Sequence, residues 1–224
     1  MTERDRVLDA LGERLAAARR GYPLRVGIDG ICGSGKTIFA RDLVSVLTAR
    51  GIPTIHLDSD GFHHVRAVRQ RKLADEARGY YENAYDFDAL AERVLVPLGP
   101  GGSGTYATEV HDLATDAVIE DRTAQADPRS VVVFACTFIQ RGGLRDLWDE
   151  VVYLDTARDV ALRRGVERDA DALGGSKAAE ATYERRYMAA CDLYLAHERP
   201  VERASLVIAH DDPGAPRILR DFVS

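Results

Sequence analysis

The chain has 224 residues, 46% of them hydrophobic, and a formal net charge of −6. This length and composition suit a single globular domain with a buried core. The negative charge argues against a general nucleic-acid-binding protein, which would need a basic surface for phosphate contacts. No apolar run reaches the roughly 18 residues that cross a bilayer, so we expect no membrane partner.

The three cysteines, Cys32, Cys136 and Cys191, are widely spaced and odd in number. This pattern is typical of reduced thiols and not of a disulfide framework or a zinc site. The first residues also lack the basic segment and apolar core of a secretory signal. We therefore expect a cytoplasmic protein.

The first predicted elements enclose a glycine-rich loop. Residues 3–20 place apolar side chains on one face and predict an amphipathic helix. Residues 24–29 predict a strand, in which Val26 and Ile28 share a face. Residues 36–50 have apolar positions at helical spacing and predict a helix that a glycine ends.

The loop between that strand and helix, residues 30–37 (GICGSGKT), fits the phosphate-binding P-loop pattern G-x-x-x-x-G-K-[ST]. Its glycines let the backbone curl so that successive N–H groups point at phosphate oxygens. Lys36 supplies a mobile positive charge for the β- and γ-phosphates, and the Thr37 hydroxyl can ligate Mg²⁺. The loop therefore predicts binding of a nucleoside triphosphate. The residues assigned to it are Gly30, Gly33, Ser34, Gly35, Lys36 and Thr37.

Strands and helices alternate through the rest of the chain, which predicts a parallel sheet with right-handed crossovers. Further strands are predicted at 53–57, 130–136, 151–155 and 204–209, the last of them closing the sheet, and helices at 87–98, 157–170 and 178–196. Residues 65–80 are polar and predict a solvent-facing segment. Ligands collect at the carboxyl ends of parallel strands. We therefore expect the site to use residues 30–37, 58–64 and 137–141, within one domain spanning 1–224.

Two acids follow the second predicted strand, beside the P-loop. Asp58 or Asp60 could accept the proton of an acceptor hydroxyl during phosphoryl transfer, with the other near Mg²⁺. The alternative is an Asx-type turn that closes the strand. His63 and His64 follow, but no further His or Cys lies at ligand spacing, so they are not assigned to a metal.

The order of these motifs resembles the kinase family that contains uridine kinase, phosphoribulokinase and bacterial pantothenate kinase. The segments that carry the resemblance are IDG…GKT at 28–37, DGFH at 60–63, NAYDFD at 83–88, FIQR…LWD at 138–149 and RR…RD at 163–169. The resemblance covers about residues 22–212. It implies an α/β P-loop NTPase fold, a nucleoside-kinase-like three-layer sandwich with a five-stranded parallel sheet in the order 2-3-1-4-5. It also implies an acceptor-side segment at about 60–120 and a helical lid at about 160–180.

The resemblance further implies Mg²⁺-dependent transfer of the γ-phosphoryl group of ATP to a hydroxyl of a nucleoside-like, sugar or pantothenate-like molecule. By position, Asp60 matches the catalytic base of the family and Asp58 precedes it as a second acid. Tyr81, Tyr85, His111 and Arg141, together with Asp60 and His63, are candidates for the acceptor site. Tyr81, Tyr85, His111 and Arg141 could equally be amphipathic residues at the boundary between surface and core.

Three arginines mark the predicted lid helix. Arg164 and Arg168 are four residues apart and share a helical face, from which they could reach the triphosphate and stabilise charge that develops during transfer. Arg163 is assigned to nucleotide binding. The alternative is a solvated basic face balanced by nearby acids. Which arginine contacts which phosphate is not fixed by the pattern.

Two departures from uridine kinases affect the interpretation. Ala135 stands where those enzymes carry an acid that organises Mg²⁺, so metal binding would rest on Thr37, the triphosphate and Asp58. Asn83 replaces an aspartate on the acceptor side. The leading hypothesis is a small-molecule kinase, and the alternative is a nucleotide-binding regulatory module or weak pseudokinase. A GTPase switch is excluded because the chain has no Asn-Lys-x-Asp motif. A homodimer is expected only as the commonest oligomer.

Overall fold

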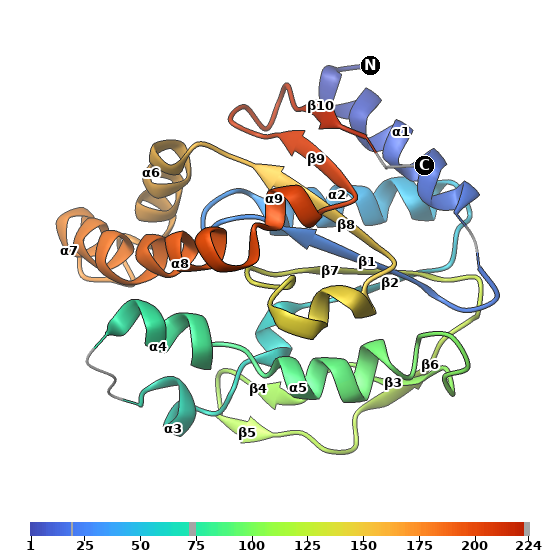
Figure 1. Ribbon diagram of the computed structural model, residues 1–224, viewed down its shortest axis with the longest axis horizontal. Helices are drawn as coiled ribbons and strands as arrows, with labels where there is room; N and C mark the ends of the chain where they lie inside the picture. Colours follow the sequence, from blue (N-terminus) through green and yellow to red (C-terminus); the bar gives the residue numbers. More distant parts are fainter. Residues whose placement is uncertain (19, 72–74, 222–224) are drawn as a thin grey trace.

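The computed structural model of the protein describes residues 1–18, 20–71 and 75–221. At its centre is a six-stranded sheet, in which β1 (Leu24–Asp29) lies between β7 (Val131–Ala135) and β8 (Glu150–Asp155). The full order is β10-β9-β8-β1-β7-β2 (Figure 1). The other three strands are β2 (Thr54–Leu57), β9 (Leu206–Ala209) and β10 (Arg217–Arg220).

Five strands are parallel and run β2-β7-β1-β8-β9 across the sheet. Counted along the chain, this is the order 2-3-1-4-5 that the resemblance implied. The sheet differs from the expectation at one edge, where β10 pairs antiparallel with β9, so β9 is not the last strand. The sequence did not reveal β10 because it is an edge strand with largely exposed side chains and no buried apolar run.

The central strands β1 and β7 are buried along their whole length. Parallel strands covered on both faces carry near-continuous apolar runs, as β7 does. β1 also contains Gly27, where a Cβ would overlap the Ile139 side chain and crowd the Trp148 ring. This glycine therefore lets both side chains pack directly against the middle of the sheet.

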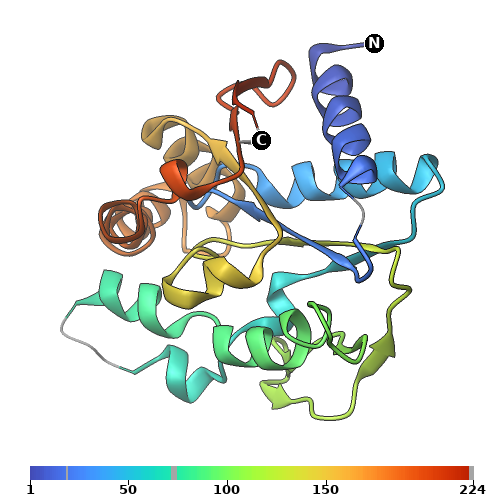
Figure 2. The ribbon, with the colours of Figure 1, turned by 45° about the vertical axis from the view of Figure 1, so that its right-hand side comes forward.

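Helices cover both faces of the sheet. α1 (Glu3–Ala17) and α2 (Lys36–Ala49) lie above it in Figures 1 and 2, with Leu43 fully buried beneath them. The opposite face carries a larger core cluster that includes Phe134 and Trp148. The arrangement is the three-layer α/β sandwich expected from the sequence.

The remaining helical segments differ in length, and two of them contain a π-helical turn, one within a helix that runs without a break over residues 176–198. They are a 3₁₀ turn at Ser59–Phe62, α3 (Arg66–Arg69), α4 (Glu76–Asn83), α5 (Phe87–Leu90) with a π-helical turn at Ala91–Leu95, a 3₁₀ segment at Gly142–Leu147, α6 (Arg158–Asp169), α7 (Ser176–Thr182), a π-helical turn at Tyr183–Met188, α8 (Ala189–Glu198) and α9 (Pro200–Arg203). No helix in the described part of the chain is long and apolar enough to cross a membrane.

The segment 65–80 is more structured than its polar composition suggested. It contains α3 and the first residues of α4, while residues 72–74 lie outside the described residues. Asp75 caps α4 by accepting hydrogen bonds from the N–H groups of Ala77 and Arg78. α4 packs against α8 and the π-helical turn before it, so its charged residues cover only its outer side.

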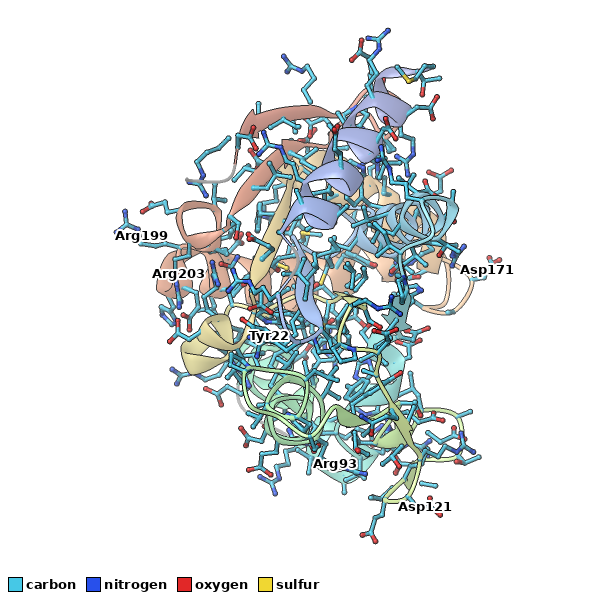
Figure 3. All side chains as sticks on the ribbon, turned by 90° about the vertical axis from the view of Figure 1, so that its right-hand side faces the viewer. Tyr22, Arg93, Asp121, Asp171, Arg199 and Arg203 are labelled. Carbon is cyan, nitrogen blue, oxygen red and sulfur yellow. The ribbon has the colours of Figure 1, made fainter. Side chains whose placement is uncertain are left out.

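Two small hairpins lie near α5, on the side of the sheet opposite α1 and α2 (Figure 1). The guanidinium of Arg93 (labelled in Figure 3) donates to the carbonyls of Ile119 (2.9 Å) and Glu120 (2.6 Å), so Arg93 joins the helical segment after α5 to the residues that follow the strand Ala117–Val118. The hairpins pair β3 (Thr105–Ala107) with β6 (Thr123–Gln125) and β4 (His111–Asp112) with β5 (Ala117–Val118).

Candidate active site

A cavity of about 380 Å³ opens where the carboxyl ends of β1, β2 and β7 meet. Open parallel sheets bind ligands at this edge. The walls come from the P-loop, the 3₁₀ turn after β2, the loop after β7, α4, the end of α6 and the π-helical turn before α8.

The P-loop adopts the curved path that its pattern predicts. Gly33 and Gly35 have φ angles of 80° and 92°, which residues with a side chain rarely adopt. At Gly33 a Cβ would also overlap the carbonyl oxygen of Ala161 in α6. The glycine therefore allows both the curvature of the loop and the close approach of α6.

The loop fits a triphosphate. Lys36 Nζ donates to the carbonyls of Gly30 (3.0 Å) and Ile31 (2.8 Å), so the ammonium lies against the loop, and Thr37 lines the same cavity. The first-turn N–H groups of α2 have no partner within the helix and are oriented for an anion. In the described residues no group of three or more His, Cys, Asp or Glu side chains could hold a metal ion. A magnesium site would therefore depend on Thr37 and on phosphate oxygens.

His210, which the sequence did not single out, supports the P-loop from the loop after β9. Its Nδ1 lies 2.8 Å from the carbonyl oxygen of Ser34, and since a carbonyl only accepts, Nδ1 carries the proton. Burial lowers the pKa of His210 and favours the neutral ring. Gly30, Ser34 and Gly35 belong to the loop but lie outside the cavity lining.

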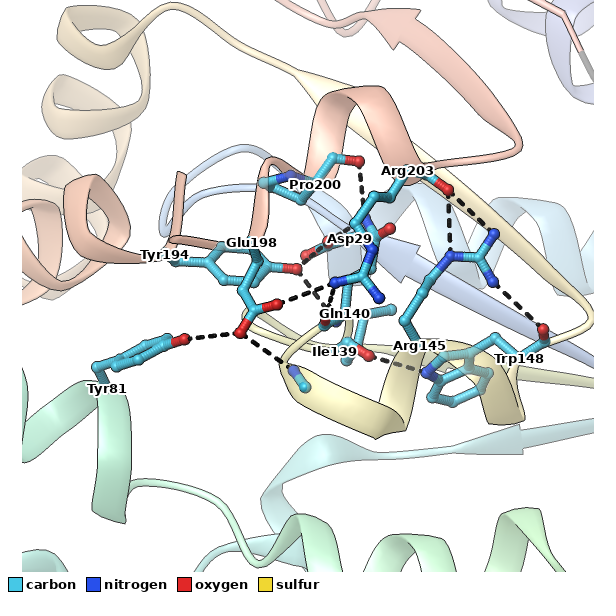
Figure 4. A network of polar contacts seen from close by, with 11 residues as sticks. Asp29, Tyr81, Ile139, Gln140, Arg145, Trp148, Tyr194, Glu198, Pro200 and Arg203 are labelled. Carbon is cyan, nitrogen blue, oxygen red and sulfur yellow. Dashed lines mark hydrogen bonds and ion pairs between the residues drawn. The ribbon is translucent and has the colours of Figure 1, made fainter. Parts of the chain in front are cut away.

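Asp29, the last residue of β1, anchors the start of the P-loop. Its fully buried carboxylate accepts hydrogen bonds from the Gly30 N–H (2.8 Å), Gln140 Nε2 (2.8 Å) and the Tyr194 hydroxyl (2.6 Å), the last two of which appear in Figure 4. Burial raises the pKa of Asp29. Gln140 Nε2 also donates to the Pro200 carbonyl (3.0 Å). The network joins the P-loop to the loop after β7 and to α8.

Asp60 faces the cavity from the 3₁₀ turn after β2. His63 Nε2 lies 3.6 Å from Asp60 Oδ1, while His63 Nδ1 is held by the Ala84 carbonyl at 2.8 Å. Because Nδ1 donates to the Ala84 carbonyl, Nε2 carries a proton toward Asp60 only when the His63 ring is the imidazolium. The His63 side chain lowers the pKa of Asp60, and the charge of Arg168 lowers it further. Asp60 is therefore ionised at neutral pH and can accept a hydrogen bond from a bound hydroxyl group.

Asp58 has a different environment. Its side chain accepts a hydrogen bond from the Asp60 N–H (3.0 Å), so it caps the 3₁₀ turn in the manner of an Asx turn. Like Asp60 it is exposed, but it lies outside the cavity lining. The two acids predicted together thus separate, with only Asp60 in the cavity.

The lid arginines also separate. Arg168 lines the cavity, where Asp169 (2.7 and 2.8 Å) and the Tyr183 hydroxyl (3.1 Å) hold its guanidinium. Arg164 instead donates to the carbonyls of His210 (3.1 Å) and Asp211, so it ties α6 to the loop after β9. Arg163 is exposed and outside the lining. A shared helical face was therefore insufficient to bring Arg164 to the cavity.

Of the six acceptor-side candidates, Asp60, His63 and Tyr85 line the cavity and the other three do not. Arg141 donates to the Tyr81 carbonyl, and its guanidinium carbon lies 5.3 Å from the centre of the Tyr81 ring. The Tyr81 hydroxyl in turn donates to Glu198 (3.3 Å), so the contact between Tyr81 and Glu198 holds α4 against α8.

His111 is almost fully buried and belongs to β4. Its Nε2 lies 3.0 Å from Asp116 Oδ1, and neither residue lines the cavity. Both this contact and the Tyr81–Arg141 pair correspond to the alternative of residues at the boundary between surface and core.

Several cavity residues were not singled out from the sequence. Tyr183, Arg186 and Tyr187 lie at i, i+3 and i+4, a spacing that places side chains on one helical face and could have indicated a shared role. Ala135 also lines the cavity, so the position where uridine kinases carry an acid does face the site. The remaining residues that were not singled out are Cys32, Ser59, Arg69, Tyr80, Ala84, Cys136, Thr137 and Asp169.

A P-loop between the central strand β1 and its helix, together with a carboxylate that follows β2 and faces the same cavity, is the arrangement of a P-loop phosphotransferase. Residues 26–210 match the Phosphoribulokinase / Uridine kinase family, and the chain belongs to this family. Membership implies ATP-dependent transfer of a phosphoryl group to a small-molecule hydroxyl. The chain is therefore a small-molecule kinase.

Individual relatives agree with this assignment. The chain is 27% identical over 191 residues to the uridine kinase of Leuconostoc citreum, and the aligned region covers 80% of this chain and 79% of the relative. It is 28% identical over 163 residues to the uridine kinase of Brevibacillus brevis, covering 70% and 71%. A solved structure of a possible uridine kinase from Bacillus stearothermophilus is 26% identical, with a TM-score of 0.69 over 89% of this chain and 96% of the other.

Proposed function

We propose that the chain transfers the γ-phosphoryl group of ATP to a hydroxyl of a small polar molecule held in this cavity. One observation carries the proposal: Lys36 and Thr37 of the P-loop, the Asp60 carboxylate and the Arg168 guanidinium all line it. Phosphoryl transfer is mostly positioning and charge stabilisation, and it needs a cationic donor site beside a carboxylate that faces the acceptor.

In the proposed reaction the acceptor oxygen attacks the γ-phosphorus and forms the new P–O bond. The bond between the γ-phosphorus and the oxygen that bridges it to the β-phosphate breaks, and ADP leaves. Asp60 accepts the proton of the hydroxyl group. A carboxylate with a lowered pKa suffices because, in a loose transition state, the hydroxyl becomes strongly acidic only as its bond to phosphorus forms.

Two cations of the chain would stabilise the charge on the phosphoryl oxygens. Lys36 can turn from the carbonyls of Gly30 and Ile31 to the β- and γ-phosphates. Arg168 faces the same space, and its contacts with Asp169 and Tyr183 orient its guanidinium. Such oriented groups stabilise a transition state without a reorganisation cost during the reaction.

Bound Mg²⁺ supplies neutralisation of charge on the β- and γ-phosphate oxygens. Thr37 is the cavity residue whose hydroxyl would hold the ion. Ala135 offers no ligand, and Asp58 is turned to the backbone of Asp60. The rest of the ligands would come from the triphosphate and from water.

The test is acceptor-dependent release of ADP, measured over a panel of nucleosides, sugars, sugar acids and sugar phosphates. The proposal expects turnover with one class of acceptor, and loss of that turnover in Lys36→Ala. Tight ATP binding without acceptor-dependent turnover across the panel would contradict it. That result would favour a nucleotide-binding regulatory module, the alternative for which Ala135 is the supporting observation.

A further inference from the structure

The cavity adjoins a second one of about 400 Å³, and two arginines stand at the junction. Arg69, Tyr80 and Arg186 line both cavities. The second cavity is formed by α3, the start of α4 and the π-helical turn, and none of the described residues that line it belongs to the P-loop. These arginines therefore lie on the side of the site remote from the triphosphate.

Arg186 is held in place by aromatic rings and not by an acid. Its guanidinium carbon lies 5.3 Å from the centre of the Tyr80 ring and 5.5 Å from that of Tyr187, and the two rings meet edge to face at 4.8 Å. Within the part of the chain that the structure describes, no carboxylate forms an ion pair with Arg186. Stacking fixes the plane of a guanidinium and leaves its N–H edge free. A half-buried cation of this kind fits a negatively charged ligand.

Arg69, the second arginine at the junction, is fixed by contacts with His64 and Asp116. Its Nε donates to the His64 carbonyl at 2.7 Å, and a terminal nitrogen lies 3.5 Å from Asp116 Oδ1. α3, which carries Arg69, follows directly after the turn that bears Asp60. Arg69 therefore presents its other N–H donors to the acceptor side of the cavity at a fixed position.

The balance of donors and acceptors also favours an anion. Among the described residues, the carboxylates that line the first cavity are Asp60 and Asp169, and Asp169 is occupied by Arg168 and Tyr183. In the second cavity Asp75 caps α4 and Glu76 pairs with Arg185. Arginine offers donors alone, which suit the several acceptor oxygens of a phosphate or carboxylate, whereas each hydroxyl group of a neutral polyol must also donate its own proton. Because Lys36 and Arg168 serve the triphosphate in the proposed reaction, Arg69 and Arg186 are the arginines left for the acceptor.

We infer that the acceptor carries an anionic group, a phosphate or a carboxylate, which Arg69 and Arg186 bind while a hydroxyl of the same molecule reaches Asp60. The inference rests on the proposed function and narrows its substrate class. It separates this chain from an enzyme that phosphorylates a neutral nucleoside.

The first experiment compares matched acceptors by their kcat/KM for ADP release. The pairs are ribose with ribose 5-phosphate and glycerol with glycerate, and uridine is the neutral nucleoside. We expect the charged member of at least one pair to exceed its neutral partner by about 100-fold. Comparison of ribose 5-phosphate with glycerate shows whether a phosphate or a carboxylate is preferred. Better use of uridine or of a neutral sugar would overturn the inference.

The second experiment assigns the anion to the two arginines. Arg186→Met and Arg69→Gln should each raise the KM for the charged acceptor about 10- to 100-fold, with kcat and the KM for ATP nearly unchanged. Arg186→Lys, which keeps the charge, should recover part of the loss. Arg185→Gln is the matched control, because Arg185 is exposed and pairs with Glu76 outside the lining of the first cavity. A rise in the KM for ATP instead would place these arginines on the donor side and overturn the inference.

Calorimetry of ribose 5-phosphate and glycerate binding to the ADP–Mg²⁺ complex separates the inference from the proposed function. Arg186-dependent binding without turnover would support the anion subsite and contradict the kinase proposal. Turnover of a neutral acceptor that Arg186→Met does not affect would support the kinase proposal and contradict the anion subsite. The inference would be overturned if no anionic compound were bound and none were turned over.

Discussion

The pKa of Asp60 depends on its neighbour His63. The His63 ring stacks on Tyr85, with centres 4.4 Å apart, and its Nδ1 is fixed by the Ala84 carbonyl. Its Nε2 is thereby directed at Asp60, 3.6 Å away. Because the His63 side chain lowers the pKa of Asp60, it affects the pH at which the proposed base loses its charge.

The His63→Phe substitution should therefore move the acidic limb of the pH profile. The base acts when ionised, so activity falls as the pH drops through its pKa, and loss of the His63 side chain raises that pKa. We expect the acidic limb of kcat/KM to shift to higher pH, while Phe keeps the stacking on Tyr85. His64→Phe is the control, since His64 lies outside the cavity and faces Asp86 at 3.4 Å. An unmoved limb in His63→Phe, or a limb at lower pH, would contradict this role.

Cys32 provides a chemical probe of the P-loop. Its N–H donates to the Cys191 sulfur at 3.3 Å, and a hydrogen bond with the Cys191 side chain and the charge of Lys36 lower the pKa of its thiol. Burial raises the pKa of the Cys136 thiol. Cys32 is also the one of these three that is only partly buried.

Iodoacetamide should thus label Cys32 before Cys136 and Cys191, and Mg-ATP should slow the labelling because Cys32 lines the cavity with Lys36. Peptide mass spectrometry measures both effects, and Cys32→Ser serves as the control. Labelling of Cys32 at the same rate with and without nucleotide would show that the triphosphate does not cover this part of the loop.

At the scale of elements, a buried ion pair holds the start of β1 against the start of β8. Asp149 accepts hydrogen bonds from the Arg25 N–H (2.9 Å), from Arg25 Nε (2.8 Å) and from the Tyr22 hydroxyl (3.1 Å). Both charged side chains are at most 6% exposed. Arg25 also donates to the Leu95 carbonyl (3.0 Å), so it links the sheet to the helical segment after α5.

Asp149→Ala should lower the free energy of unfolding by about 3–5 kcal/mol, because it leaves the Arg25 guanidinium buried without a counter-charge. Urea denaturation measures the change. Asp127→Ala, which removes an exposed pair with Arg129, should cost about 0–1 kcal/mol. Equal losses in the two variants would show that burial does not govern the strength of the Arg25–Asp149 pair.

The strands show what a sequence can and cannot indicate. Val131–Ala135 was recognisable because a strand buried on both faces is apolar throughout. β10 was missed since an edge strand needs no such run. The π-helical turn at Tyr183–Met188 was also not predictable, although it carries three cavity residues, because its i→i+5 pattern leaves no distinct spacing of residue types.

At the scale of the whole molecule, the donor side of the site was predictable and the acceptor side was only partly so. The P-loop pattern combines local conformation with chemistry, so its glycines, Lys36 and Thr37 could be read directly. The position of Tyr81 or Arg164 instead depends on which partner it meets after folding, a Glu198 carboxylate or the carbonyls of His210 and Asp211. Long-range contacts of this kind leave no local signal.

The central claim is that Asp60 and the P-loop form one catalytic site, with Asp60 as the base. The most direct measurement is kcat for acceptor-dependent ADP release in Asp60→Asn and Asp58→Asn at saturating ATP. We predict a loss of about 10²–10⁴-fold for Asp60→Asn. Asp58→Asn should stay within about threefold of the parent chain, because Asn can also cap the turn. An Asp60→Asn variant that retains its kcat, or a larger loss in Asp58→Asn, would contradict the claim.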